Sequence, residues 1–377
     1  MAMADGTVAA VPTETRLIYD GNTGSLLLLW LKVLGLSIIT LGFYRFWGRT
    51  RIRTYLWSHV SLLGDRCEYD GTGMELFLRF VVALFIFVPL LSITQLAALI
   101  GLGLFWAKVA SLVQLALFFY LSYFALYAGR RYRTSRTLWR GIRGGLDGSA
   151  NSYAGRAIGY IALAALTLGF TEPWRAVGLW RYEMKNTGFG NVQFDFEGRG
   201  ADLFGAFMIT WALNLLALMV LVGGAFGLVY VSWSAQGAMS HYAGGPLPTP
   251  GIGWRAFGGL AALLYLGYIV AATLAYLYFS ARSLSYSARQ TSFRRVAFAA
   301  DIKLGTLLWL QLGNLLIMIV TLGLGTPFTA QRYIRFFCSN LRLYGAEDLE
   351  LLSQDPGRRR PKGGEGLVQL LDSGGFA

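Results

Sequence analysis

The stretch ITLGFYRFWGRTR, residues 39–51, leads from an apolar segment through Thr-Leu-Gly into aromatic residues and arginines. Two similar stretches follow, LTLGFTEPWR at 166–175 and VTLGLGTPF at 320–328. Glycine after an apolar segment is a typical end of a helix. We therefore predict that each Thr-Leu-Gly, called the TLG turn below, ends an apolar helix and begins an interfacial segment.

The three TLG turns lie within longer segments that resemble one another. A shift of 154 positions places Thr167 on Thr321 and also aligns, without gaps, Arg140 with Arg294, Pro173 with Pro327 and Arg181 with Arg335. A shift of 127 positions places Thr40 on Thr167, and it also aligns Trp47 with Trp174 and Gly71 with Gly198. Similarity at fixed shifts indicates an internal repeat. The sequence therefore predicts a threefold repeat with a truncated third copy.

Composition indicates a membrane protein. Hydrophobic residues make up 55% of the 377 residues and charged residues only 14%. Residues 80–107, 203–240 and 256–281 carry no charge, and each run exceeds the roughly 20 apolar residues that cross a bilayer. The run 76–128 is long enough for two crossings, and 203–231 and 256–280 add one each. The net charge of +13 lies mostly in short arginine blocks beside these runs, which favours a role in orientation over nucleic-acid binding.

Short alternating segments that end in an acidic residue and glycine predict strands, as in RLIYDG, DRCEYDG and VQFDFEG. Strand edges cannot face lipid unpaired, so we expect small sheets or hairpins outside the bilayer. The arginine blocks at 130–143 and 282–295 should both lie in the cytosol, because the other two loops carry only Lys108 and Arg255. This count favours TLG segments that are re-entrant or broken helices over the alternative, in which each TLG segment crosses the membrane. The predicted class is an all-α polytopic membrane protein, a helical bundle with short cytosolic β-hairpins.

The repeat predicts five regions along the chain. Residues 1–15 form a flexible arm, 16–128 the first repeat, 129–281 the second, 282–352 the truncated third, and 353–377 a disordered tail. The first and second repeats each contain a TLG segment and two transmembrane helices.

The run TLGFYRFWGRTRIRTYLWSHVSLLGDRCEYDGTG, together with TLGFTEPW, KNTGFGNVQFDFEG and ARQTSFRRVAF, resembles the YjgN-like family of bacterial inner-membrane proteins. The resemblance covers roughly residues 16–352, and its TLG-aromatic-Trp-Arg signature is fairly specific. It implies a multi-pass protein of the bacterial inner membrane and supplies no established activity, because the family is a domain of unknown function.

Basic residues near the TLG turns are the candidate contacts for an anion or a lipid headgroup: Arg45, Arg49, Arg51, Arg53, Arg175 and Arg332. The simpler interpretation is that these arginines only orient the chain and reach lipid phosphates. Polar residues expected at membrane depth are Lys32, Asn214 and Asn314. The expected helix breaks are Gly42, Gly169, Pro173, Gly323 and Pro327.

No enzyme class is predicted. Two cysteines and two histidines are a poor ligand supply, so no metal site and no cofactor is expected. Two functions remain open: transport or channelling of an anionic amphiphile or small solute, and a non-transporting scaffold or lipid-binding role with a basic cytosolic face. The expected partners are membrane lipids with anionic headgroups and no nucleic acid, with envelope proteins or a second copy as further alternatives.

Overall fold

The computed structural model describes residues 14–100, 103–243 and 252–355. Its chain separates into two compact units. Unit 1 contains residues 1–200, 285–301 and 310–377, and unit 2 contains residues 201–284 and 302–309.

Three pairs of short helices, the TLG helix pairs, each contain one TLG turn. They are α1 (Thr23–Ile39) with α2 (Arg45–Ser58), α5 (Ala150–Leu166) with α6 (Glu172–Asn186), and α9 (Leu304–Val320) with α10 (Thr326–Asn340). Each apolar first helix has 17 residues, about 25 Å at 1.5 Å per residue, which is short of the roughly 30 Å bilayer core.

The TLG turn has the same hydrogen bonds in all three pairs. The glycine N–H of Gly42, Gly169 and Gly323 donates to a carbonyl five residues back, at 2.7 Å each time. The threonine hydroxyl donates to a carbonyl four residues back, at 2.7, 2.7 and 2.6 Å. Both the leucine and the glycine have positive φ, near +50° and +90°. The expected helix break is therefore a compact turn that satisfies its own backbone groups.

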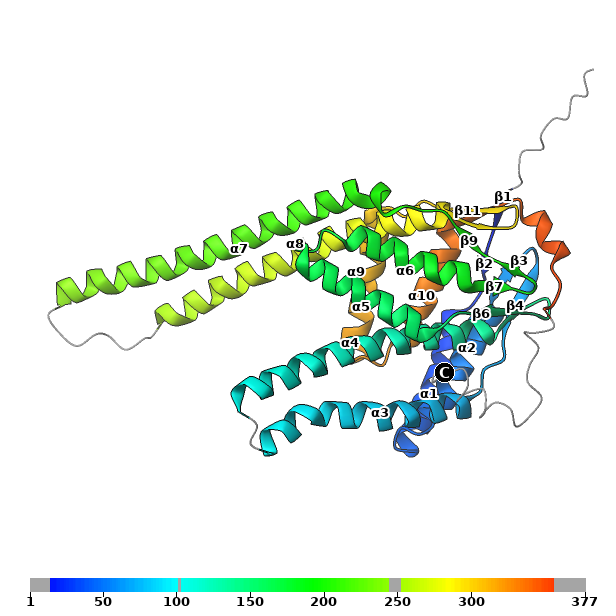
Figure 1. The fold of residues 1–377 in the computed structure, drawn as a ribbon, viewed down its shortest axis with the longest axis horizontal. Coiled ribbons are helices and arrows are strands. Elements are labelled where there is room, and N and C mark those ends of the chain that lie inside the picture. Colours follow the sequence, from blue (N-terminus) through cyan, green and yellow to red (C-terminus); the bar gives the residue numbers. More distant parts are fainter. Residues whose placement is uncertain (1–13, 101–102, 244–251, 356–377) are drawn as a thin grey trace, which may run out of the picture. The chain divides into compact units, whose positions relative to one another are not determined.

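The structure also contains long helices, α3 (Gly73–Leu99) and α4 (Leu104–Ser135), followed later by α7 (Gly200–Ala243) and α8 (Ile252–Arg289) (Figure 1). Four segments of these helices are long and apolar enough to cross a membrane: Gly73–Leu90, Phe105–Ser135, Gly200–Val231 and Gly258–Arg289. The four predicted crossings therefore correspond to helices in the structure. By length and composition, the chain is a membrane protein.

Within unit 2, α7 and α8 pack against each other. The Phe207 and Phe279 rings meet edge to face, with centroids 5.8 Å apart. The Thr210 hydroxyl donates to the Ala275 carbonyl at 3.2 Å, and Gly224 gives room for Leu264. Small and hydroxyl residues at such contacts are typical of helix packing in membranes.

The predicted helical class is confirmed in part, because the described residues are mostly helical but also form two antiparallel sheets in place of separate short hairpins. One has the order β1-β12-β11-β10-β9 and the other β2-β3-β4-β5-β6-β7-β8. Their strands are β1 (Glu14–Arg16), β2 (Ile18–Tyr19), β3 (Val60–Leu62), β4 (Asp65–Tyr69), β5 (Thr137–Trp139), β6 (Ile142–Leu146), β7 (Thr187–Phe189), β8 (Val192–Gln193), β9 (Asp195–Phe196), β10 (Thr291–Phe293), β11 (Val296–Ala300) and β12 (Leu341–Tyr344). The alternation in the sequence identified strands, but strand pairing is set by residues far apart in the chain.

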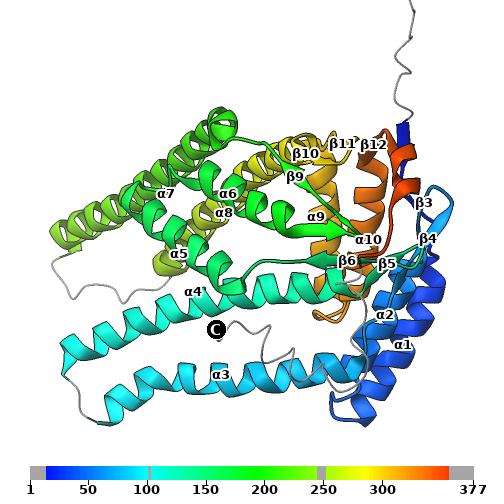
Figure 2. The ribbon, with the colours of Figure 1, turned by 45° about the vertical axis from the view of Figure 1, so that its right-hand side comes forward.

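The two sheets are joined at both edges. Only Leu17 separates β1 from β2, and only Phe194 separates β8 from β9. The order of neighbouring strands therefore closes into a ring, in which the N-terminal β1 pairs with the C-terminal β12. Strands β3 to β6 and β9 to β12 are labelled in Figure 2. Side chains of both sheets meet in one buried cluster that includes Trp139, Phe293 and Leu343. Ala346 and Leu349 of the 3₁₀ helix η1 (Ala346–Leu351) complete that cluster.

Every helix pair begins and ends at neighbouring strands of the ring. The strands before and after the TLG helix pairs are hydrogen-bonded to each other: β2 with β3, β6 with β7, and β11 with β12. The strands that flank the long pairs are also neighbours, β4 with β5 and β9 with β10. After each helix pair, the chain therefore returns to a strand that is hydrogen-bonded to the strand before the pair.

Element bounds recur at the shifts found in the sequence. A shift of 127 positions carries α1 onto α5 and β3 onto β7, with identical ends. A shift of 154 positions carries α5 onto α9, β5 onto β10 and β6 onto β11, also with identical ends.

The predicted N-terminal arm and C-terminal tail lie mostly outside the described residues. Of the tail, the Ser353 carbonyl accepts a hydrogen bond from Asn191 N–H at 3.1 Å, and the Gln354 side chain accepts one from Arg143 N–H at 2.7 Å.

Candidate anion-binding site

Helix α2 carries the predicted arginines of the first TLG helix pair. Arg45, Arg49 and Arg53 are four residues apart and so follow one face of the helix. Partial burial and the charges of Arg45 and Arg53 lower the pKa of Arg49. The Arg53 guanidinium donates to the Tyr69 hydroxyl at 3.3 Å, and Arg51 lies over the Tyr44 ring, 5.7 Å from its centroid.

Helix α4 extends this row of positive charge. Arg133 of α4 lies within electrostatic reach of Arg53 and of Arg130 on its own helix. Arg130 is neutralised by the buried carboxylate of Glu183. Arg45, Arg49, Arg53 and Arg133, called the arginine row below, form no ion pair with a carboxylate in the part of the chain that the structure describes. Four cations without counter-ions are an electrostatic attractor for an anion.

The predicted arginines of the other TLG helix pairs are in a different state. Arg175 is held by the carboxylate of Glu172 through two contacts and also donates to the Tyr123 hydroxyl at 3.3 Å. The Arg332 guanidinium folds over Gly313 of α9 and donates to the Leu310 carbonyl at 3.5 Å. The structure therefore does not bring the six predicted arginines together at one point.

The predicted polar residues at membrane depth also differ from one another. The side chain of Lys32 is exposed on α1. The Asn214 amide donates to the Thr210 carbonyl on its own helix at 2.9 Å. Asn314 is 5% exposed, and neither its amide nitrogen nor its oxygen has a hydrogen-bond partner in the described part of the chain.

The prolines after the second and third TLG turns begin helices. Pro173 and Pro327 are buried in the first turn of α6 and α10, where a missing N–H costs nothing.

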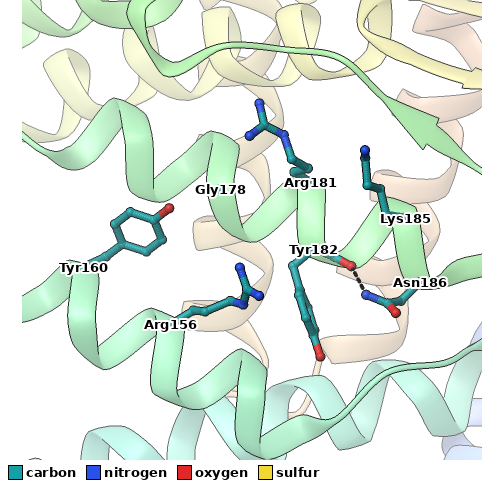
Figure 3. Close-up of a pocket in the computed structure, with 7 residues that line it drawn as sticks. All are labelled: Arg156, Tyr160, Gly178, Arg181, Tyr182, Lys185 and Asn186. Atoms are coloured by element: carbon teal, nitrogen blue, oxygen red, sulfur yellow. Dashed lines mark hydrogen bonds between the residues drawn. The ribbon is translucent and has the colours of Figure 1, made fainter.

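A second basic region lies between α5 and α6, and the sequence did not predict it. Its lining residues enclose a recess of about 240 Å³ (Figure 3). They are Arg156 and Tyr160 from α5, and Gly178, Arg181, Tyr182, Lys185 and Asn186 from α6. The repeat shifts contained a signal for this recess, because Gly178 corresponds to Arg51 in the first TLG helix pair and to Arg332 in the third.

The described residues contain no group of three or more His, Cys, Asp and Glu side chains that could hold a metal ion. The arginine row and the second basic region contain guanidinium, ammonium, amide and phenol groups, which bind oxyanions by charge and hydrogen bonds.

Residues 14–370 match the family described as "Bacterial protein of unknown function (DUF898)". The chain belongs to this family. The YjgN-like resemblance inferred from the TLG stretches is thereby confirmed. No curated protein and no solved structure matches the chain.

Proposed function

We propose that this DUF898 protein is a multi-pass protein of the bacterial inner membrane that binds an anionic amphiphile through the arginine row. The observation that supports this most is the contrast among the predicted arginines. The arginine row, three residues of α2 with Arg133 of α4, has no carboxylate partner in the described residues, whereas Arg175 is paired with Glu172. An arginine that only oriented the chain would gain nothing from standing in a row of like charges.

The strand ring supports a single-sided topology. The strands that flank each TLG helix pair are hydrogen-bonded neighbours, so the chain enters and leaves the membrane on one side. The TLG segments are then re-entrant, and the strands and arginine blocks lie together in the cytosol, where the excess of positive charge belongs.

Ring contacts support a shallow position for the first TLG turn. Phe43, next to the turn, meets Phe77 of α3 with centroids 6.0 Å apart, and Phe46 meets Phe80 at 5.1 Å. These α3 residues lie in the first half of the candidate span Gly73–Leu90. The turn therefore belongs in one leaflet, with Arg45 and Arg49 rising from it toward the headgroups.

The three turns expose leucines of the same kind. Leu41, Leu168 and Leu322 are 91%, 78% and 89% exposed. An exposed leucine at positive φ is costly in water, because it gains no burial in return for its strain. Acyl chains around the turn would supply that burial.

The recurring bounds support a threefold internal repeat. Hydrogen bonds recur at the same shifts: the Tyr55 hydroxyl donates to the Asn22 carbonyl, and the Tyr182 hydroxyl to the Ser149 carbonyl, at 2.7 and 2.9 Å. After the end of α8, the third copy contains β10, β11, α9, α10 and β12 before η1. Its β12 then pairs with β1 of the first copy, which closes the ring.

The arginine row is tested by removing equal charge at two places. Purified Arg49→Gln/Arg53→Gln should retain at least about a hundredfold less anionic phospholipid, because each charge-assisted hydrogen bond is worth roughly 1.5–3 kcal/mol. Arg66→Gln/Arg175→Gln is the matched control, and it should retain wild-type amounts because carboxylates already neutralise both of these arginines. Lipid would be quantified by mass spectrometry. Equal losses in both variants would show that only net charge matters and would refute a site at the row.

A further inference from the structure

The recess between α5 and α6 is separate from the arginine row and has a basic lining. Its seven lining residues include Arg156, Arg181 and Lys185 and no carboxylate. Figure 3 shows Arg156 and Tyr160 reaching from α5 toward α6, while Arg181 and Lys185 rise from α6 itself. The two helices therefore present cations around one opening.

Gly178 lets the Tyr160 side chain lie against α6. A Cβ at Gly178 would lie 2.3 Å from the Tyr160 hydroxyl, so a larger residue there would displace that phenol. The corresponding Arg332 of α10 instead places its guanidinium over Gly313 of α9. The second TLG helix pair thus has space where the third has an arginine side chain.

The cations of the recess are available to a ligand. Arg156 lies over the Tyr182 ring, 5.1 Å from its centroid, and makes no ion pair within the described ranges. Lys185 is 3.8 Å from the Asp195 carboxylate, and both side chains are more than half exposed. An exposed pair of that length contributes little, so Lys185 can leave it for an anion. Arg181 already donates to the Gly198 carbonyl and has further N–H groups to offer.

Helix α5 becomes apolar from the recess toward its TLG turn. Arg156, Tyr160 and Leu163 are spaced four and three residues apart and so share one face. Leu163 and Leu166 are 48% and 82% exposed, and Leu168 of the turn is 78% exposed. Along the helix, a cation is followed by a phenol and then by exposed leucines. A phospholipid has the same order, from a charged headgroup to apolar acyl chains.

We propose that the recess binds the phosphate of a glycerophospholipid and that an acyl chain of this lipid lies along α5 toward Leu168. The volume of about 240 Å³ is below the roughly 300–1,000 Å³ of sites that enclose a whole drug-sized ligand. It admits a headgroup and leaves the chains outside. Arg156 supplies paired N–H donors to the phosphate oxygens, and Lys185 supplies a point charge.

This inference extends the proposed function to a second site with its own residues, so the two can fail independently. Binding at the recess depends on Arg156 and Gly178, whereas binding at the arginine row depends on Arg49 and Arg53. The Arg49→Gln/Arg53→Gln protein, with its recess intact, would therefore separate the two contributions.

Variants of the recess can use the residues that stand at the corresponding positions of the other two TLG helix pairs. Leucine occupies the position of Arg156 in both other copies, as Leu29 and Leu310. The third copy has Asn314 and Arg332 at the positions of Tyr160 and Gly178. Arg156→Leu therefore removes the cation, and Tyr160→Asn/Gly178→Arg fills the recess while adding positive charge. The unfolding midpoint of each protein would verify the fold.

The experiment titrates the full chain in detergent with phosphatidylglycerol and, separately, with sn-glycerol 3-phosphate, and follows binding by native mass spectrometry. Arg156→Leu should weaken phosphatidylglycerol binding about tenfold, as expected for the loss of a charge-assisted hydrogen bond. Tyr160→Asn/Gly178→Arg should weaken it as well, despite its extra charge. Wild-type binding by both variants would refute the site. Binding of glycerol 3-phosphate as tight as that of the lipid would refute the acyl-chain contact and leave a site for a soluble phosphate.

Discussion

Two arginines of α4, Arg130 and Arg133, differ in whether a carboxylate lies beside them. Glu183 is 5% exposed, pairs with Arg130 of α4 and accepts a hydrogen bond from the Tyr153 hydroxyl at 2.7 Å. Burial and the bond to Glu183 raise the pKa of Tyr153, which keeps the phenol protonated and donating. The same helix α4 presents Arg133 with no carboxylate partner in the described residues. One arginine of α4 therefore holds helices together, and another is free to meet an anion.

The pair of Arg130 and Glu183 gives a prediction about stability. Glu183→Ala should lower the free energy of unfolding by about 2–3 kcal/mol, because the partly exposed Arg130 and the Tyr153 hydroxyl both lose their partner. Arg130→Leu/Glu183→Leu should recover most of that loss, since leucine stands at the corresponding positions, Leu284 and Leu56. About 1 kcal/mol or more should remain, because the Tyr153 hydroxyl loses its acceptor. Thermal unfolding in detergent measures all three proteins. A double variant no more stable than Glu183→Ala would show that the pair matters for packing and not for charge.

Among the elements, the TLG turn explains why one tripeptide recurs. The threonine hydroxyl donates to the carbonyl four residues back, at the end of the first helix. In the first and third turns, the same hydroxyl accepts a hydrogen bond from the backbone N–H of the residue that precedes the second helix, at 2.9 and 2.8 Å. Glycine takes the positive φ that the reversal needs. Leucine takes positive φ as well, so its strain must be offset where the turn resides.

Two glycines of the first TLG helix pair test this account. Gly42 has φ of +91°, whereas Gly35 lies inside α1, and a Cβ at either position would meet no atom within 4 Å. Gly42→Ala should therefore destabilise the protein by about 1 kcal/mol or more, through backbone strain alone. Gly35→Ala should stabilise it by up to about 1 kcal/mol, as alanine does within a helix. Unfolding midpoints in detergent compare the two. A change of the same sign for both would contradict the role of conformation at the turn.

The sequence predicted local features better than distant ones. Apolar runs ending in TLG predicted the ends of α1, α5 and α9 to within one residue, because helix ends depend on neighbouring residues. RLIYDG was predicted as a strand, but its partners β3 and β12 were not, since no local pattern encodes which distant strand it pairs with. The free or paired state of Arg49 and Arg175 was equally hidden, because it depends on which acidic side chain packs nearby.

The recess between α5 and α6 shows why part of the site was missed. The predicted contacts were chosen for their charge beside a TLG turn, whereas the recess depends on a residue without a side chain. The role of Gly178 becomes visible only in the fold, where the Tyr160 side chain of α5 lies against it. Comparison at the shifts of 127 and 154 positions could have identified Gly178, because the corresponding positions hold Arg51 and Arg332.

At the scale of the whole molecule, the ring of strands organises the chain. Antiparallel sheets normally leave edge strands, which invite pairing with other chains, and a closed order removes those edges. Closure requires β1 to meet β12, so the first and last described strands hold the ring together. The same closure dictates where the helices go, because each helix pair leaves and rejoins at paired strands.

The ring therefore predicts that every strand turn lies on one side of the membrane. Arg140 and Arg294 are exposed in the turns β5–β6 and β10–β11, and Gly103 is exposed at the start of α4, at the far end of α3–α4. Single cysteines at these three positions, in a chain with Cys67→Ser and Cys338→Ser, would be labelled with a membrane-impermeant maleimide. Cells before and after opening of the inner membrane distinguish the two sides. We expect cysteines at 140 and 294 to react only after opening and the cysteine at 103 to react before it, because α3 crosses once and the arginine turns remain in the cytosol. Opposite sides for 140 and 294 would mean that the TLG segments cross, and the hydrogen-bonded ring could not then exist in the membrane.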